Sequence, residues 1–104
     1  MTDNEYTDLT NKIDKELKEY KDFIMTKDKK DIYESYYQIH AHEEIHDYLT
    51  NEGKKFNYKG FPKKDIIDWL YRRFMKSEYN LCYEDLGYLV DYETKKNLKK
   101  QQEL

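Results

Sequence analysis

Apolar residues recur near the N-terminus at the spacing of an α-helix. Between residues 5 and 25 they lie three or four positions apart, at Tyr6, Leu9, Ile13, Leu17, Tyr20 and Ile24. Positions three and four apart share one face of a helix, and Lys, Asp and Glu occupy the other faces here. The spacing predicts an amphipathic helix over 5–25. A polar break over 26–30 follows, in which Asp28 is expected to cap the next helix.

Three further helices are predicted downstream. Residues 29–51 carry a broad apolar face and predict one long helix. Residues 51–62 hold two of the three glycines and the only proline, which predicts a loop, with a short β-hairpin around Phe56 and Tyr58 as an alternative. A third helix is expected over 62–78, with Pro62 in its first turn. A fourth is expected over 83–96, where Gly87 either allows a close helix contact or weakens the helix.

These elements predict an all-α fold, a compact bundle of about four helices. Residues 1–96 are expected to form one helical domain, followed by a polar tail at 97–104. The predicted core consists of Leu9, Ile13, Leu17, Ile32, Tyr36, Ile39, Leu49, Ile66, Leu70, Phe74, Leu86 and Leu89.

Charge is sorted into three consecutive blocks. Residues 31–52 carry six acidic side chains and no Lys or Arg, whereas residues 53–76 carry eight basic side chains and two acidic ones. Residues 77–93 carry five acidic side chains and no base, although the net charge of the whole chain is only −3. Eight of the twelve tyrosines lie in the two acidic blocks. The blocks either pair with one another inside the fold or form a charged, aromatic surface for a partner.

Composition excludes several classes of protein. No apolar run approaches the roughly 20 residues that a membrane span needs, and the N-terminus does not resemble a signal peptide. The only cysteine, Cys82, cannot form an internal disulfide, so a cytoplasmic location is expected. Proteins that bind nucleic acid directly are usually basic, which this chain is not. No Gly-rich phosphate loop is present, and no cofactor is expected.

One enzyme-like motif is present, the H-E-x-x-H pattern from His42 to His46. On a helix, two imidazoles four residues apart can chelate zinc, and the intervening Glu43 can activate a bound water. Because of this motif, a small zinc metallopeptidase is an alternative function. The later sequence supplies carboxylates but no histidine for a third zinc ligand, which counts against it. The simpler interpretation, polar and partly exposed positions on an acidic helix, predicts neither metal binding nor catalysis.

Two segments resemble a known kind of protein. They are similar to segments of small acidic, tyrosine-rich helical proteins. The first segment is DIYESYYQIHAHEEIHDYL, and the second is DIIDWLYRRF followed by YEDLGYLVDY. Phages and mobile elements of low-GC Gram-positive bacteria encode such proteins, including inhibitors of the anti-CRISPR and host-takeover type. The resemblance covers roughly residues 29–96 and rests on pattern and composition. It implies a stoichiometric binder of a host protein.

The acidic blocks then suggest how such a protein would bind. Carboxylates spaced along a surface imitate phosphates, and phenol rings imitate stacked bases or fill pockets on a partner. We therefore expect an inhibitor of a host nucleic-acid enzyme, favouring a CRISPR RNA-guided nuclease, with a structural or oligomeric phage protein as a further alternative. The residues expected to bind the partner are Tyr37, Glu43, Glu44, Asp47, Tyr48, Glu84, Asp85, Tyr88, Asp91 and Tyr92.

Overall fold

Helices account for most of residues 1–102, the part of the chain that the structure, a computed structural model, describes. Five are α-helices and two are short 3₁₀ helices, and this range contains no strand. The predicted all-α bundle is thereby confirmed. The elements are α1 (Asp3–Met25), α2 (Lys29–Glu34), α3 (Tyr36–Glu52), η1 (Gly53–Lys55), η2 (Tyr58–Gly60), α4 (Ile66–Met75) and α5 (Tyr83–Gln102).

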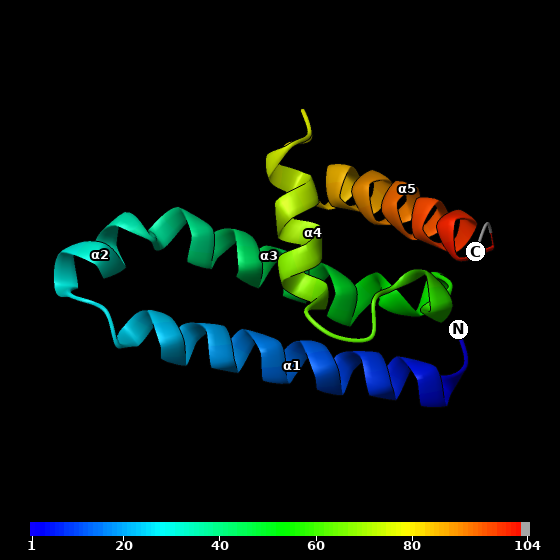
Figure 1. The fold of residues 1–104 in the computed structure, drawn as a ribbon, viewed down its shortest axis with the longest axis horizontal. Helices are drawn as coiled ribbons and strands as arrows, with labels where there is room; N and C mark the ends of the chain where they lie inside the picture. Colours follow the sequence, from blue (N-terminus) through cyan, green and yellow to red (C-terminus); the bar gives the residue numbers. More distant parts are fainter. Residues whose placement is uncertain (103–104) are drawn as a thin grey trace.

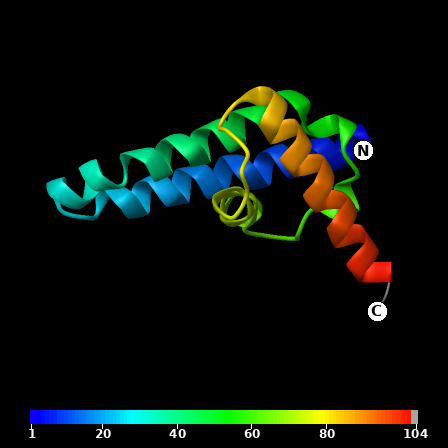
Figure 2. The same cartoon turned by 90° about the horizontal axis from the view of Figure 1, so that it is seen from above.

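A long antiparallel hairpin of α1 and α3 forms the frame of the molecule (Figure 1). The short α2 closes one end of the hairpin. Near the middle, α4 crosses both helices, and Figure 2 shows it end-on against them. Helix α5 packs on α4 and on α3, so α4, α5 and the loop over 51–62 all lie toward the end that holds the N-terminus. We call this the packed end and the opposite end, around α2, the far end.

The main core cluster lies in the packed end, and Ile24, near the far end, is buried outside this cluster. Eight of the predicted core residues are buried, and three others, Leu17, Ile32 and Ile39, are half-buried. The loop adds Phe56 and Phe61 to the core, and their rings meet edge to face with centroids 6.4 Å apart. The eight buried residues that the sequence predicted are Leu9, Ile13, Leu49, Ile66, Leu70, Phe74, Leu86 and Leu89.

The predicted helix over 29–51 is two helices, α2 and α3. Ser35 separates them with φ −87° and ψ 2°, a conformation that takes the backbone out of the α-helical range. The apolar periodicity of one helix therefore does not continue across Ser35. As a result Tyr36, predicted to be in the core, is 71% exposed. Asp28 stands at the N-cap position of α2, but its side chain makes no capping hydrogen bond.

The loop and α4 also differ from the prediction. The segment over 51–62 contains η1 and η2 instead of a β-hairpin. Helix α4 begins at Ile66, four residues after Pro62, because Asp65 is in the left-handed region with φ 57°. The N–H of Ile67, in the first turn of α4, donates to Glu16 Oε1 of α1 at 3.0 Å. This bond joins the start of α4 to the hairpin.

Helix α5 continues beyond the predicted end at residue 96, as far as Gln102. Two side chains of this last part contact η2: Asn97 Nδ2 donates to the carbonyl of Gly60 at 2.9 Å, and Gln101 Nε2 donates to the carbonyl of Lys59 at 3.0 Å. The predicted polar tail is therefore helical up to residue 102, and its last two positions lie outside the described residues. None of the helices of residues 1–102 is long and apolar enough to cross a membrane.

Candidate protein-docking groove

A groove of about 590 Å³ opens between the end of α3 and the first turns of α5. Lys55 of η1 and the adjacent Phe56 complete its lining. Its walls combine aromatic rings with carboxylates, and most of these residues come from the two acidic blocks. The groove is lined by Tyr48, Glu52, Lys55, Phe56, Tyr83, Glu84, Gly87, Tyr88 and Asp91.

Gly87 allows α5 to lie directly against Tyr48. A Cβ atom at position 87 would stand 2.9 Å from the Tyr48 hydroxyl oxygen, closer than van der Waals contact permits. Of the two readings of Gly87, the close helix contact is therefore the one that the structure supports. Tyr48 is only 2% exposed, and its hydroxyl has no hydrogen-bond partner among the described residues. Burial raises the pKa of this phenol above its ordinary value of 10.0.

Polar contacts fix the start of α5 beside α3. Asn51 Nδ2 donates to the Tyr83 hydroxyl at 2.5 Å, and the Tyr83 ring meets the edge of Tyr48 with centroids 5.2 Å apart. Before the helix begins, the N–H of Asn80 donates to Asp85 Oδ2 at 2.7 Å. The groove is therefore bounded by side chains that tertiary contacts hold in place.

The electrostatic character of the groove is acidic. Three carboxylates line it, those of Glu52, Glu84 and Asp91, against one ammonium group, that of Lys55. Lys55 Nζ lies 3.5 Å from Glu52 Oε2 and 5.5 Å from the centre of the Phe56 ring. A cation within about 6 Å of an aromatic centre is attracted by the electrons of the ring. The groove thus already holds one cation between a carboxylate and an aromatic ring, and this chemistry suits a cationic side chain from another protein.

The structure brings four of the predicted partner-binding residues together, namely Tyr48, Glu84, Tyr88 and Asp91. Tyr88 is exposed, and its hydroxyl donates to Glu84 Oε1 at 3.4 Å. Tyr48 was predicted to bind a partner, but it is buried against Gly87 and forms part of the groove wall instead. Asp91 Oδ2 lies 3.0 Å from Lys95 Nζ, one turn further along α5.

The other predicted residues lie outside the groove. On α5, Asp85 is engaged by Asn80, and the exposed Tyr92 lies one turn beyond Tyr88. On α3, Glu43 turns toward α1, with Oε2 at 3.5 Å from Lys21 Nζ. The remaining α3 residues are Tyr37 near the far end, Glu44 one turn before Tyr48, and the exposed Asp47 beside His46.

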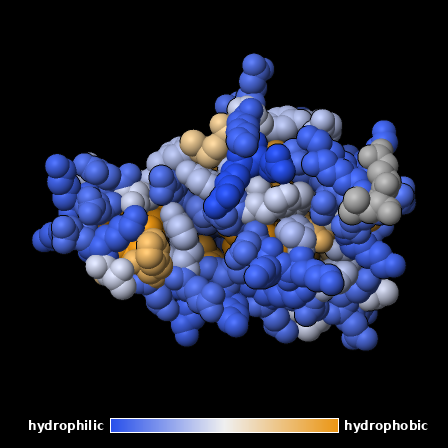
Figure 3. Space-filling model, viewed as in Figure 1, coloured by the Kyte–Doolittle hydropathy of each residue, from blue (hydrophilic) through white to orange (hydrophobic). Residues whose placement is uncertain are grey.

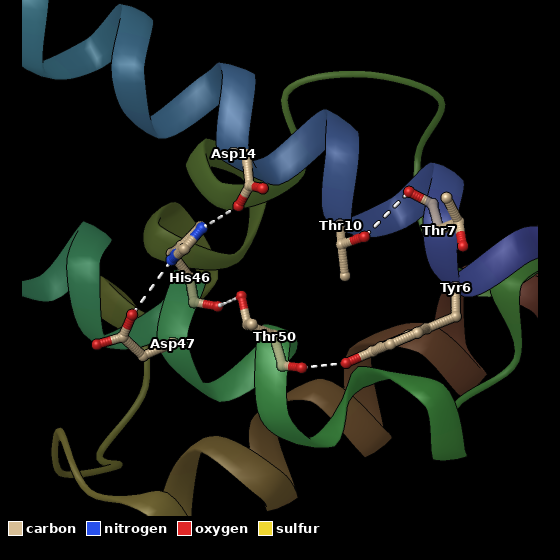
Figure 4. Close-up of polar contacts among 7 residues, drawn as sticks. All are labelled: Tyr6, Thr7, Thr10, Asp14, His46, Asp47 and Thr50. Carbon is tan, nitrogen blue, oxygen red and sulfur yellow. Dashed lines mark hydrogen bonds and ion pairs between the residues drawn. The ribbon is translucent and has the colours of Figure 1, made fainter. Parts of the chain in front are cut away.

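The two histidines of the H-E-x-x-H motif are separately engaged. His42 is 3% exposed and stacks on Tyr20 with ring centres 3.9 Å apart, while its Nδ1 lies 2.7 Å from the carbonyl oxygen of Gln38. Both nitrogens of His46 face carboxylates, Nε2 at 2.6 Å from Asp14 and Nδ1 at 3.2 Å from Asp47 (Figure 4). Within residues 1–102, no group of three His, Cys, Asp or Glu side chains is placed to hold a metal ion.

His42 also corrects the simpler interpretation of the motif, which placed it on a partly exposed helix face. Burial lowers its pKa below the ordinary 6.5, and this effect exceeds the opposing influence of the Gln38 carbonyl and of Asp68. A buried imidazole stacked on a tyrosine and bonded to the backbone is typical of a packing residue. The motif thus joins α3 to α1, and it does not line the groove.

Pairing between the charge blocks is sparse. Between α4 and the acidic block over 77–93, the described residues form one ion pair, Arg73 Nε to Glu93 Oε2 at 3.8 Å. Arg72 instead pairs within its own helix, with Nε 2.9 Å from Asp68 Oδ2. Most acidic side chains of α5 therefore make no ion pair with the described residues of α4.

Sequence reasoning missed Glu52, Lys55, Phe56, Tyr83 and Gly87 as members of the groove. Among them Gly87 carried the most specific signal, because an isolated glycine inside a helix often marks a close contact. Comparison with models of protein families, with curated proteins and with solved structures found nothing similar to this chain.

Proposed function

We propose that this chain is an inhibitor encoded by a phage or mobile element that binds a host nucleic-acid enzyme. The favoured target is a CRISPR RNA-guided nuclease. The observation that carries the proposal is the open groove between α3 and α5, where carboxylates meet tyrosine rings from both acidic blocks. The resemblance of residues 29–96 to small phage-encoded inhibitors points to the same class.

The chemistry of the groove matches the side chains with which nucleic-acid enzymes hold phosphate. Such enzymes use Arg and Lys to bind the backbone and to read short duplex motifs. A guanidinium group pairs with a carboxylate such as Glu84 or Asp91 and stacks on an aromatic face such as Tyr88. An arginine held in this way is no longer available to nucleic acid, so binding alone inhibits the enzyme.

Charge also determines the expected kinetics. The acidic groove attracts a basic channel over a distance, which accelerates association at low ionic strength. Salt screens this attraction with a Debye length of roughly 8 Å at physiological strength. Association with the target should therefore slow as salt rises, while dissociation changes less.

The test measures inhibition of DNA cleavage by RNA-guided nucleases from low-GC Gram-positive bacteria. Retention of each nuclease on the immobilised chain is measured in parallel. The groove variant carries Glu84→Gln and Asp91→Asn, which remove charge with little change in shape. We expect it to bind at least about 10-fold more weakly than the unchanged chain and to inhibit correspondingly less.

The matched control carries Asp22→Asn and Asp28→Asn, which remove the same charge from exposed positions near the far end. It should bind and inhibit like the unchanged chain. Equal loss in both variants would mean that only net charge matters and would contradict docking through the groove. If no nuclease is retained or inhibited and light scattering shows a stable homo-oligomer, the inhibitor proposal fails in favour of a structural phage protein.

A further inference from the structure

A second charged surface lies on the side of α5 that faces away from the groove. Glu84, Tyr88 and Asp91 line the groove, whereas Lys96 and Lys100 project from the other face of the same helix, as the helical repeat requires. Arg73 of α4 lines one hollow together with these lysines. A second hollow holds Arg73 together with Arg72 and Lys76. Figure 3 shows hydrophilic side chains along the course of α4.

Trp69 stands at the centre of this basic surface. Part of its indole packs against the core, and it also lines two adjoining hollows. One hollow, of about 440 Å³, runs along α4 and includes Lys64, Arg72 and Lys76. The other lies between α4 and α5 and includes Lys96 and Lys100. Cations from two helices thus surround one aromatic side chain.

Most of this positive charge is not neutralised within the protein. Lys64, Lys76, Lys96 and Lys100 make no ion pair with any described residue. Arg72 and Arg73 each contact one carboxylate through Nε alone. Two acidic residues, Asp65 and Asp68, line the larger hollow. They also line a neighbouring pocket together with Glu16 of α1, so they lie on the α1 side of the hollow.

We propose that the surface around Trp69 binds single-stranded nucleic acid. Lysine ammonium groups on either side would contact successive phosphates, and the indole of Trp69 would stack on a base between them. A duplex offers phosphates but keeps its bases stacked on one another, so it cannot use the indole. This activity goes beyond the proposed inhibition, because it uses other residues and the opposite face of α5. The net charge of −3 argues against nucleic-acid binding by the chain as a whole, whereas the cations gathered around Trp69 make this one surface positive.

The presence of one tryptophan makes the test specific to the site. Selective excitation of Trp69 in the full chain reports only on this surface, since the chain has no second tryptophan. The probe is a labelled oligothymidylate of about 15 nucleotides, a length within the range that single binding modules cover. We expect quenching of Trp69 fluorescence at the same concentrations that raise the fluorescence anisotropy of the oligonucleotide.

The site variant carries Lys64→Gln, Lys76→Gln and Lys96→Gln. The control carries Lys18→Gln, Lys29→Gln and Lys30→Gln, which remove equal charge from exposed positions of α1 and α2. Each phosphate contact contributes about −0.7 to the slope of log K against log salt for single strands, so the site variant should lower the magnitude of that slope by about 2. Its affinity should fall by about 10-fold or more, whereas the control keeps the original slope.

Several outcomes would overturn the proposal. Equal losses of affinity in the site and control variants would show that only the net charge attracts the oligonucleotide. Binding of a duplex of the same length, or of vesicles rich in phosphatidylserine, as tight as that of the oligonucleotide would show general affinity for anions. Unchanged Trp69 fluorescence during binding would exclude stacking.

Two variants test the ring of Trp69 itself. A Trp69→Phe variant, checked for helix content by circular dichroism, should retain part of the affinity. A Trp69→Ala variant that binds as well as the unchanged chain would contradict the role of the ring.

The groove variant, with Glu84→Gln and Asp91→Asn, separates this proposal from the proposed inhibition. It should bind oligothymidylate as well as the unchanged chain or slightly better, because it removes acidic charge from the molecule without touching the basic surface. Loss of oligonucleotide binding in this variant would contradict two independent surfaces.

Discussion

The packed end and the far end of the α1–α3 hairpin are built from the same kinds of residue, but the packed end holds the main core cluster, whereas at the far end of α1 burial is limited to Ile24. At the packed end, Leu9, Ile13 and Leu49 are buried beneath α4, α5 and the loop over 51–62. At the far end only α2 accompanies the two long helices, and Tyr33 is 83% exposed. Apolar periodicity determines which face of a helix can be buried. Burial itself also requires a neighbouring element to cover that face.

This difference separates two kinds of surface tyrosine. At the packed end, tertiary contacts around Tyr48 and Tyr83 hold the walls of the groove in a fixed geometry. At the far end, exposed rings such as Tyr33 and Tyr36 make few contacts with the rest of the chain. Anchors that are already ordered lose less conformational entropy on binding. We therefore expect the groove, and not the far end, to carry the binding energy.

The largest effect on stability is expected from Leu70→Ala in the packed end. Leu70 is fully buried in α4 where it crosses the hairpin, so its truncation removes apolar contact and leaves a cavity. The free energy of unfolding should fall by about 2–5 kcal/mol, measured by urea denaturation. A loss below about 1 kcal/mol would contradict burial at this crossing.

Gly87→Ala tests the close contact between α5 and Tyr48. The added methyl group would collide with the Tyr48 hydroxyl, which should lower the free energy of unfolding by about 1–3 kcal/mol despite the better helix propensity of alanine. Tyr48→Phe removes the hydroxyl that lacks a partner and should be neutral or stabilising. The double variant should recover most of the loss. Equal losses in the presence and absence of Tyr48→Phe would contradict the contact.

A smaller effect is expected from Ile32→Ala at the far end. Ile32 is half-buried in α2, so its truncation removes less apolar area from the protein and leaves no enclosed cavity. We expect a loss of about 1 kcal/mol in the same urea assay. A loss as large as that of Leu70→Ala would show that the two ends are packed alike.

The smallest effect concerns pH and His42. Because the pKa of His42 is lower in the folded chain than its ordinary 6.5, the unfolded chain takes up the proton first as pH falls. The stability that neutral His42 supplies is fully present above that ordinary value and is lost as pH decreases toward the folded value. Between about pH 7 and pH 5, the unchanged chain should lose more stability than a His42→Phe variant. Equal losses in the two chains would contradict burial of a neutral imidazole.

The sequence predicted the helices well where apolar spacing was uninterrupted. The stripe from Leu9 to Ile24 lies on α1, and α5 begins at the predicted Tyr83. Local backbone geometry was harder to foresee. The break at Ser35 and the left-handed Asp65 are conformations of single residues, and the spacing of apolar positions does not encode these.

The candidate site was predicted only in part. The charge blocks indicated Glu84, Tyr88 and Asp91, because these residue types are informative on any surface. They could not indicate that Glu52 and Phe56 face the same groove, since that depends on how α5 crosses the end of α3. Tyr48 shows the reverse error. Its place in an acidic, tyrosine-rich block predicted that it binds a partner, whereas packing against Gly87 makes it part of the groove wall.

The most direct test of the central claim compares the two ends in binding to one purified RNA-guided nuclease that the chain inhibits. Isothermal titration calorimetry would measure the affinity of Tyr88→Ala in the groove and of Tyr33→Ala with Tyr36→Ala at the far end. All three tyrosines are exposed, so the variants remove similar rings with little effect on the core. We predict about 30-fold weaker binding for Tyr88→Ala and a change of about 2-fold or less for the far-end variant. The reverse order would contradict docking through the groove.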